Sequence, residues 1–131
     1  MKKVLVTGGC GYIGAHTILD LIENNFEPVC IDNNSRSTTA LLEGIKDITG
    51  KMVKNYKVDL CNFDDTYAGL QENTDIQGII HFAAYKVVGE SVESPLLYFE
   101  NNLIGGRRVP AFAQNNGYIY RKPHRRAADA F

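Results

Sequence analysis

The stretch that decides the fold of this chain is KVLVTGGCGYIG, residues 3–14. Residues 3–7 predict a short buried strand, because Val4, Leu5 and Val6 are consecutive apolar residues and two of them are β-branched. Glycines then follow with the spacing G-x-x-G-x-x-G, and apolar residues recur at helical spacing from Tyr12 to Asn24. The sequence therefore predicts a strand, a tight glycine turn and a helix in direct succession.

A glycine turn that opens a helix is a candidate anion site. The missing Cβ atoms let the backbone turn sharply and approach a ligand, and the unpaired N–H groups of the first helical turn point at its charge. The ligand that suits this arrangement best is the pyrophosphate of a dinucleotide, although the commoner dehydrogenase fingerprint is G-x-G-x-x-G.

Composition sets limits on the class of protein. A chain of 131 residues with 44% hydrophobic and 22% charged residues predicts one soluble globular domain. A net charge of −1 argues against nucleic-acid and membrane partners, and no apolar run approaches the ~20 residues of a membrane span. No signal peptide is expected. Three cysteines, Cys10, Cys30 and Cys61, have no metal-ligand spacing and fit a reducing cytoplasm.

Charge is distributed unevenly along the chain. Residues 105–131 hold six basic residues against one acidic residue, a net charge of +5, whereas residues 1–104 hold eight basic and fourteen acidic residues, a net charge of −6. We therefore expect residues 1–104 to form the folded unit and residues 105–131 to form an atypical basic tail.

The remaining pattern alternates strands and helices. Further strands are expected at residues 28–32, 56–60 and 77–84, and further helices at residues 40–48, 63–71 and 95–104, the last beginning at Ser94-Pro95. Four β-α units in series predict an α/β, doubly wound parallel sheet with right-handed crossovers and helices on both faces. The expected strand order is 3-2-1-4, with strand 4 left as an open edge.

Asp32 is the strongest candidate for recognising the nucleoside. It follows Gly14 by 18 residues and ends the second expected strand, close to the ~20 residues typical of the acid that binds an adenosine ribose. This position favours NAD over NADP, because a carboxylate repels a 2′-phosphate. Two alternatives stay open: Asp32 caps a turn, or Arg36 meets a 2′-phosphate.

Other polar residues have competing interpretations. Asp59 is expected at a strand tip, where it could accept a hydrogen bond from adenine or cap the next helix. His81 lies within the fourth strand and is interpreted as a core histidine rather than a base. Lys86 either steadies a phosphate or is a surface lysine. Asn101 and Asn102 are poor helix formers, so we expect a hydrogen bond within the fold or to a ligand.

Several stretches resemble one known family. Residues 7–17, TGGCGYIGAHT, resemble the N-terminus of extended short-chain dehydrogenase/reductases, which have a Rossmann-like fold, and residues 32–33, 58–60 and 81–84 match the same superfamily. Residues 86–92, KVVGESV, followed by Pro95-Leu96, Tyr98-Phe99 and Asn101-Asn102, narrow the resemblance to UDP-glucose 4-epimerases. The resemblance ends near residue 105.

The resemblance implies NAD as cofactor and a set of binding residues. These are Gly8, Gly11, Tyr12, Ile13 and Gly14 for the pyrophosphate, Asp32 and Asn33 for the ribose, Asp59 and Leu60 for the adenine, and Phe82, Ala83, Ala84, Lys86 and Asn101 towards the nicotinamide, with Ser37 also assigned to the cofactor. It also implies interconversion of UDP-glucose and UDP-galactose through a 4-keto intermediate, with hydride leaving and returning at the sugar C4.

The chain departs from the family pattern after residue 105. The family's general base is a tyrosine with a lysine four residues later, some fifty residues beyond the asparagine that matches Asn101. Tyr118 and Lys122 have that spacing but follow Asn101 too soon, so we interpret them as a coincidence. Pro110 and its neighbours also interrupt the expected helix. These departures favour a truncated relative with an aberrant tail.

Three hypotheses follow, in order of preference. The chain is an epimerase by descent that is inactive alone, an autonomous NAD-binding module, or an interaction protein whose basic residues 105–131 recruit an acidic partner. For the chain itself we expect weak NAD affinity, low stability and self-association through the exposed sheet edge.

Overall fold

The computed structural model describes residues 1–85, 88–104, 109, 113 and 119–121, and within them it contains a parallel sheet of five strands in the order β3-β2-β1-β4-β5. The strands are β1 (Lys2–Thr7), β2 (Phe26–Ile31), β3 (Asn55–Tyr56), β4 (Ile76–His81) and β5 (Ile119–Arg121). The helices are α1 (Tyr12–Glu23), α2 (Ala40–Thr49), α3 (Phe63–Gln71), α4 (Val88–Glu93) and α5 (Pro95–Phe99), followed by a π-helical segment (Glu100–Ile104). The predicted α/β fold and the order 3-2-1-4 are confirmed.

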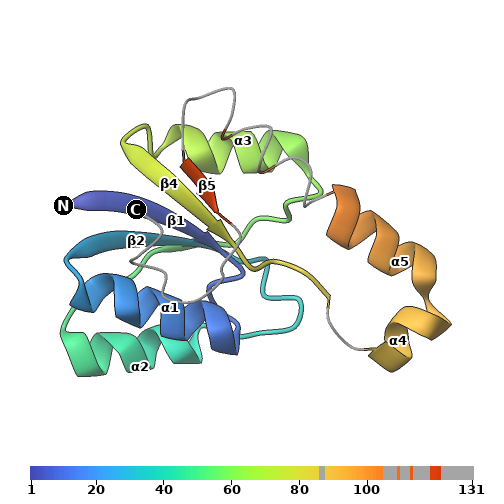
Figure 1. The fold of residues 1–131 in the computed structure, drawn as a ribbon, viewed down its shortest axis with the longest axis horizontal. Helices are drawn as coiled ribbons and strands as arrows, with labels where there is room; N and C mark the ends of the chain where they lie inside the picture. Colours follow the sequence, from blue (N-terminus) through green and yellow to red (C-terminus); the bar gives the residue numbers. More distant parts are fainter. Residues whose placement is uncertain (86–87, 105–108, 110–112, 114–118, 122–131) are drawn as a thin grey trace.

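Helices cover both faces of the sheet. In Figure 1, α1 and α2 lie on one face and α3 lies on the other, while α4 and α5 lie together beyond one end of the sheet. β1 is central, because it pairs with β2 on one side and β4 on the other, all in parallel. The loops that follow these three strands therefore emerge at one edge of the sheet.

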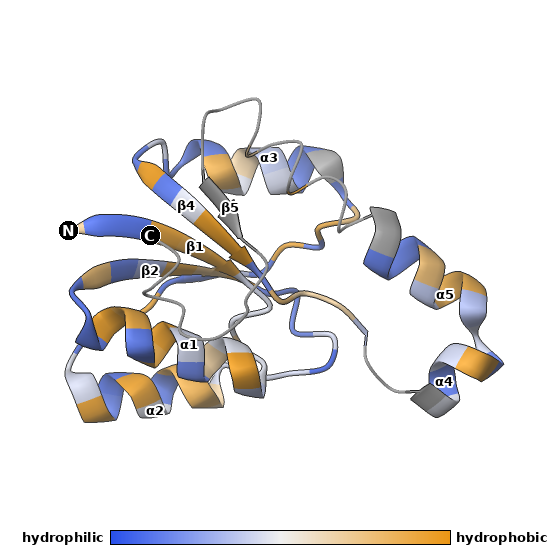
Figure 2. Cartoon of the chain, viewed as in Figure 1, coloured by the Kyte–Doolittle hydropathy of each residue, from blue (hydrophilic) through white to orange (hydrophobic). Residues whose placement is uncertain are grey.

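The core has two halves that follow the alternation of side chains along β1. Val4 and Val6 are fully buried and pack with Ile18 and Leu21 of α1 on one face of the sheet. Leu5 points to the opposite face, where it belongs to a second cluster with Ile79 of β4 and Leu70 of α3. Figure 2 shows hydrophobic residues along β1 and β4 and on α1, as expected for strands buried on both faces.

The third strand is shorter than expected. Only Asn55 and Tyr56 pair with β2, whereas the sequence predicts a strand over residues 56–60. The Val58 N–H bonds to the Tyr56 carbonyl oxygen at 2.9 Å, so the chain turns away from the sheet immediately. Asp59 therefore lies in a turn and not at a strand tip. It does not cap α3 either, because the Asn62 side chain accepts the bond from the Asp65 N–H.

The helix expected over residues 95–104 is divided. Regular α-helix ends at Phe99, and residues 100–104 continue as a π-helical segment. Asn102 in this segment is bonded in both directions to the backbone of Tyr85: its Oδ1 accepts from the Tyr85 N–H at 2.7 Å, and its Nδ2 donates to the Tyr85 carbonyl at 3.0 Å. The expectation of a hydrogen-bonded asparagine within the fold is confirmed for Asn102. α4 was not predicted.

A fifth strand extends the sheet, and here the expectation was wrong. β5 pairs in parallel with Gly78, Ile79 and Ile80, so β4 is not an open edge along this length. Ile119 and Tyr120 have high β propensity, which favours this pairing. Three residues from the expected tail therefore belong to the sheet. The rest of residues 105–131, apart from Val109 and Ala113, lies outside the described residues.

Two isoleucines provide a matched test of the core. Ile18 is 0% exposed and Ile48 is 75% exposed, and both lie in helices, so Ile→Ala removes the same atoms from a helical residue at each site. We expect Ile18→Ala to lower the free energy of unfolding by about 2–5 kcal/mol, because it leaves a cavity in the core. Ile48→Ala is expected to change it by less than about 0.5 kcal/mol. Urea unfolding followed by circular dichroism measures both, and equal losses would contradict the packing described above.

Candidate functional site

One cavity lies where the loops after β1, β2 and β4 converge. It has a volume of about 460 Å³ and opens to solvent. The structure brings fourteen of the fifteen predicted site residues to its wall: Gly8, Gly11, Tyr12, Ile13, Gly14, Asp32, Asn33, Ser37, Asp59, Leu60, Phe82, Ala83, Ala84 and Asn101. The fifteenth, Lys86, lies outside the described residues.

The glycine loop is packed tightly against its neighbours. Gly8 has φ of +71°, a conformation that favours glycine, and its N–H donates to the Ile31 carbonyl at 2.8 Å. A Cβ at Gly8 would lie 2.8 Å from the Ala83 nitrogen, and one at Gly14 would overlap the Gly8 carbonyl oxygen. The fold itself therefore requires glycine at positions 8 and 14.

Gly11 has a different environment. A Cβ there would meet only the Gly8 carbonyl oxygen, at 3.4 Å, which is ordinary contact. Its backbone is extended, with φ of −75°, so other residues could adopt it. Gly11 nevertheless lines the cavity, directly before α1. Packing against the described residues does not require glycine at this position.

The N-terminus of α1 also lies at this cavity. Gly11 occupies the N-cap position and has no side chain to cap the helix, and the first turn of this fully described helix contains no acidic residue. Tyr12, Ile13 and Gly14 therefore present their N–H groups at the cavity wall. Partial positive charge on these groups suits an anion such as a phosphate.

Asp32 lies directly after β2 and is held by hydrogen bonds on three sides. Its Oδ2 accepts from the Cys10 N–H at 3.1 Å, which ties it to the glycine loop. Its Oδ1 accepts from the Asn34 N–H at 2.9 Å and from the Ser37 hydroxyl at 3.1 Å. A carboxylate has about four lone-pair positions, so three bonds fix its orientation and leave capacity for a ligand hydroxyl.

The loop after β2 is held in place by its own side chains. Asn33 Oδ1 accepts from the Ser35 N–H at 3.0 Å. Asn55 of β3 donates to the Asp32 carbonyl oxygen at 3.2 Å and to Asn34 Oδ1 at 3.0 Å. The loop is thereby pinned to the neighbouring strand, so the side chains of Asp32 and Asn33 have a defined position at the cavity wall.

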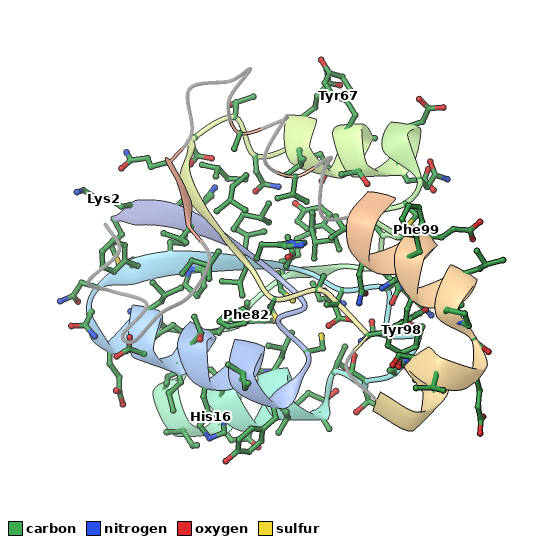
Figure 3. All side chains as sticks on the ribbon, turned by 45° about the vertical axis from the view of Figure 1, so that its right-hand side comes forward. Lys2, His16, Tyr67, Phe82, Tyr98 and Phe99 are labelled. Carbon is green, nitrogen blue, oxygen red and sulfur yellow. The ribbon has the colours of Figure 1, made fainter. Side chains whose placement is uncertain are left out.

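The chain leaving β4 forms the opposite wall. His81 is half-buried, and its Nδ1 shares a hydrogen bond of 2.6 Å with the buried Thr7 hydroxyl, in keeping with its interpretation as a residue of the fold. Phe82 follows near the centre of the molecule (Figure 3), and then the small residues Ala83 and Ala84 line the cavity. Their small side chains leave room for a flat group to pass across the ends of the strands.

A charged cluster at the cavity rim joins the β2–α2 loop to α4 and α5. The Arg36 guanidinium forms an ion pair with Glu90 and lies over the ring of Tyr85, 4.1 Å from its centroid. The second Glu90 oxygen accepts from the Tyr98 hydroxyl at 2.8 Å. Figure 3 shows Tyr98 on the side of α5 that faces the sheet. The Arg36 guanidinium, and then the Tyr98 hydroxyl, hold the pKa of Glu90 below its usual range.

Six further residues line the cavity, although the sequence did not predict them as site residues: Ile31, Ser35, Arg36, Val58, Cys61 and Tyr85. Most of them adjoin a predicted site residue in the chain, so the rule that strand ends form the site would have included them. Arg36 was considered for a 2′-phosphate, but its ion pair with Glu90 could not be foreseen, because the two residues are 54 positions apart.

Buried thiols lie beneath the glycine loop. Cys10 and Cys30 are 2% and 0% exposed, and their Sγ atoms are 4.0 Å apart. The neighbouring Cys10 thiol and burial raise the pKa of Cys30.

All three cysteines are free, and among residues 1–85 and the other described positions no cluster of three potential metal ligands occurs. No helix in the described part of the chain is long and apolar enough to cross a membrane.

Comparison with known proteins agrees with this geometry. A family model described as GDP-mannose 4,6 dehydratase matches residues 5–122. The UDP-glucose 4-epimerase of Bacillus subtilis is 46% identical over 102 residues, which are 78% of this chain and 30% of the relative. The predicted resemblance to UDP-glucose 4-epimerases is confirmed, and the chain spans about a third of the length of the relatives that it matches.

Solved structures of UDP-glucose 4-epimerases are also similar to this chain in fold and sequence. The UDP-glucose 4-epimerase of Bifidobacterium longum, in complex with NAD⁺ and UDP, superposes with a TM-score of 0.84 at 35% identity, covering 91% of this chain and 36% of its own. The enzyme of Stenotrophomonas maltophila, with bound NAD and formylated UDP-arabinopyranose, has a TM-score of 0.83 at 36% identity, covering 90% of this chain and 35% of its own. By its family model, this chain belongs to the GDP-mannose 4,6 dehydratase family.

Proposed function

We propose that this chain is the NAD-binding part of a UDP-glucose 4-epimerase, with residues 1–104 as its main folded unit. The observation that carries the proposal is the juxtaposition of two groups in one cavity. The uncapped N-terminus of α1 offers N–H donors to a pyrophosphate, and the Asp32 carboxylate offers acceptors to a ribose. The solved relatives that contain NAD support the same assignment.

The assignment of individual residues remains part of this proposal. Gly11, with Gly8 and Gly14 shaping the loop around it, admits the pyrophosphate. Asp32 binds the ribose nearest to β2, supported by Ser37 and Asn33. Asp59 and Leu60 receive the adenine, although the Asp59 carboxylate already accepts the Cys61 N–H at 2.9 Å. Phe82, Ala83, Ala84, Lys86 and Asn101 direct the rest of the cofactor towards the substrate.

The proposed ligands and cellular location of the protein are inferred from its charge, its cysteines and its relatives. NAD and, in the complete enzyme, UDP-glucose or UDP-galactose are the proposed ligands, and the net charge of −1 favours neither nucleic acid nor membrane. Three free cysteines favour the cytoplasm. Because β5 covers part of the β4 edge, we propose that self-association uses another surface. The exposed apolar side chains of Val92 in α4 and of Leu96 and Phe99 in α5 provide one.

Gly11→Ala tests the pyrophosphate assignment. The added methyl group has room within the protein and is carried by a residue that lines the cavity, so we expect the stability to change by less than about 1 kcal/mol and the affinity for NAD to fall about tenfold or more. Isothermal titration calorimetry measures the affinity, and thermal unfolding measures the stability.

Gly44→Ala is the matched control for this variant. Gly44 lies in α2 with nothing within 4 Å of an added Cβ, so the same chemical change is made away from the cavity. We expect unchanged NAD affinity and a gain of about 0.5–1 kcal/mol in stability. Equal NAD affinity in Gly11→Ala, Gly44→Ala and the unaltered chain would refute the pyrophosphate site.

Turnover of sugar nucleotides provides a separate test. We propose that the 131-residue chain is catalytically inactive by itself, because the family's tyrosine and lysine are not expected within it. Tyr118 and Lys122 lie outside the described residues. An assay that couples the conversion of UDP-galactose to UDP-glucose should detect no activity from the purified chain. Activity that Tyr118→Phe abolishes would show that this pair is the catalytic base after all.

A further inference from the structure

Arg36 is a positively charged residue at the cavity wall, and it is close in sequence to Asp32, the residue proposed to bind the ribose. It follows Asp32 by four residues in the loop after β2, and both residues line the cavity. An arginine in this loop is the group that accommodates a 2′-phosphate in NADP sites. A site that contains both Asp32 and Arg36 therefore has opposing features, one selecting for NAD and one for NADP.

In the structure, Arg36 already has a partner of opposite charge. The Arg36 guanidinium is paired with Glu90 of α4, which comes from a distant part of the chain. Glu90 is itself held in position by the Tyr98 hydroxyl, and Arg36 is held against the Tyr85 ring. Arg36 and Glu90 cancel, so the net charge of Asp32, Arg36 and Glu90 together is −1.

We propose that Glu90 is a specificity-determining residue that excludes dinucleotides with a 2′-phosphate by neutralising Arg36. This inference rests on the proposed function, because it concerns the choice between NAD and NADP at the same site. A doubly charged phosphate that approaches this wall meets a net negative charge and an arginine that already has a partner. The 2′-hydroxyl of NAD carries no charge and meets neither obstacle.

Removal of the Glu90 charge should therefore release Arg36 for a phosphate. In Glu90→Gln the side chain keeps its shape, while the contact with the Tyr85 ring keeps the guanidinium at the cavity rim. We expect the affinity for NADP to rise about tenfold, because one unit of negative charge is removed near the 2′-phosphate. The affinity for NAD should stay within about twofold of the unaltered chain, which also shows that the variant is folded.

The experiment is calorimetric titration of the full 131-residue chain with NAD and with NADP. Glu93→Gln is the matched control, because Glu93 is an exposed acid on the same helix and no ion pair of Glu93 occurs among the described residues. We expect no change in its NAD-to-NADP preference. In the double variant Arg36→Gln, Glu90→Gln the gain in NADP affinity should disappear, because its positive partner is gone.

The outcomes separate the two proposals. A gain in NADP affinity in Glu90→Gln that requires Arg36 and is absent in Glu93→Gln supports the role of Glu90. NAD binding with an unchanged preference in Glu90→Gln, or an equal gain in Glu93→Gln or in the double variant, overturns that role and leaves the proposed function intact. Failure of the unaltered chain to bind NAD overturns both.

Discussion

The close approach of the Gly8 loop to the chain leaving β4 is the constraint on which the site depends. Gly8 turns with positive φ and donates to the end of β2, while its α-carbon lies so close to Ala83 that no side chain fits. Gly8, which directly follows β1, is therefore in contact with the end of β2 and with the chain that leaves β4. Because β1 is the central strand, this junction fixes the direction of α1 and brings its N-terminus to the cavity.

The position of the Asp32 carboxylate follows from the same junction. Its bond from the Cys10 N–H connects the end of β2 to the glycine loop, and the bond from Ser37 orders the loop beyond it. Under the proposed function, binding a nucleotide would require little ordering of these segments, since the donors and acceptors are already in place. Preorganisation of this kind raises affinity by lowering the entropic cost of association.

The features that follow from local sequence, and the strand order that follows from the general rules of α/β folds, were predictable, whereas several particular contacts between distant residues were not. β1, the glycine turn and Asp32 follow from a buried strand, from residues without Cβ and from a fixed spacing, all within residues 3–32. The early end of β3 depends on a bond from Val58 to Tyr56, and β5 depends on pairing with β4, some forty residues earlier. The ion pair of Arg36 with Glu90 likewise joins residues that no local pattern relates.

This contrast has a physical consequence for the site. The cavity wall formed by the glycine loop and Asp32 is built from backbone contacts between the ends of strands and from hydrogen bonds to the Asp32 carboxylate, so its geometry is tied to the core itself. The wall formed by Arg36, Tyr85 and Glu90 is held by partly exposed side chains that join a loop to α4, and ion pairs of this kind contribute little to stability. Under the proposed function, substitutions at this second wall are expected to alter which nucleotide is accepted without disturbing the sheet. The wall that recognises what all dinucleotides share would then be tied to the core, and the wall that distinguishes among them would not be.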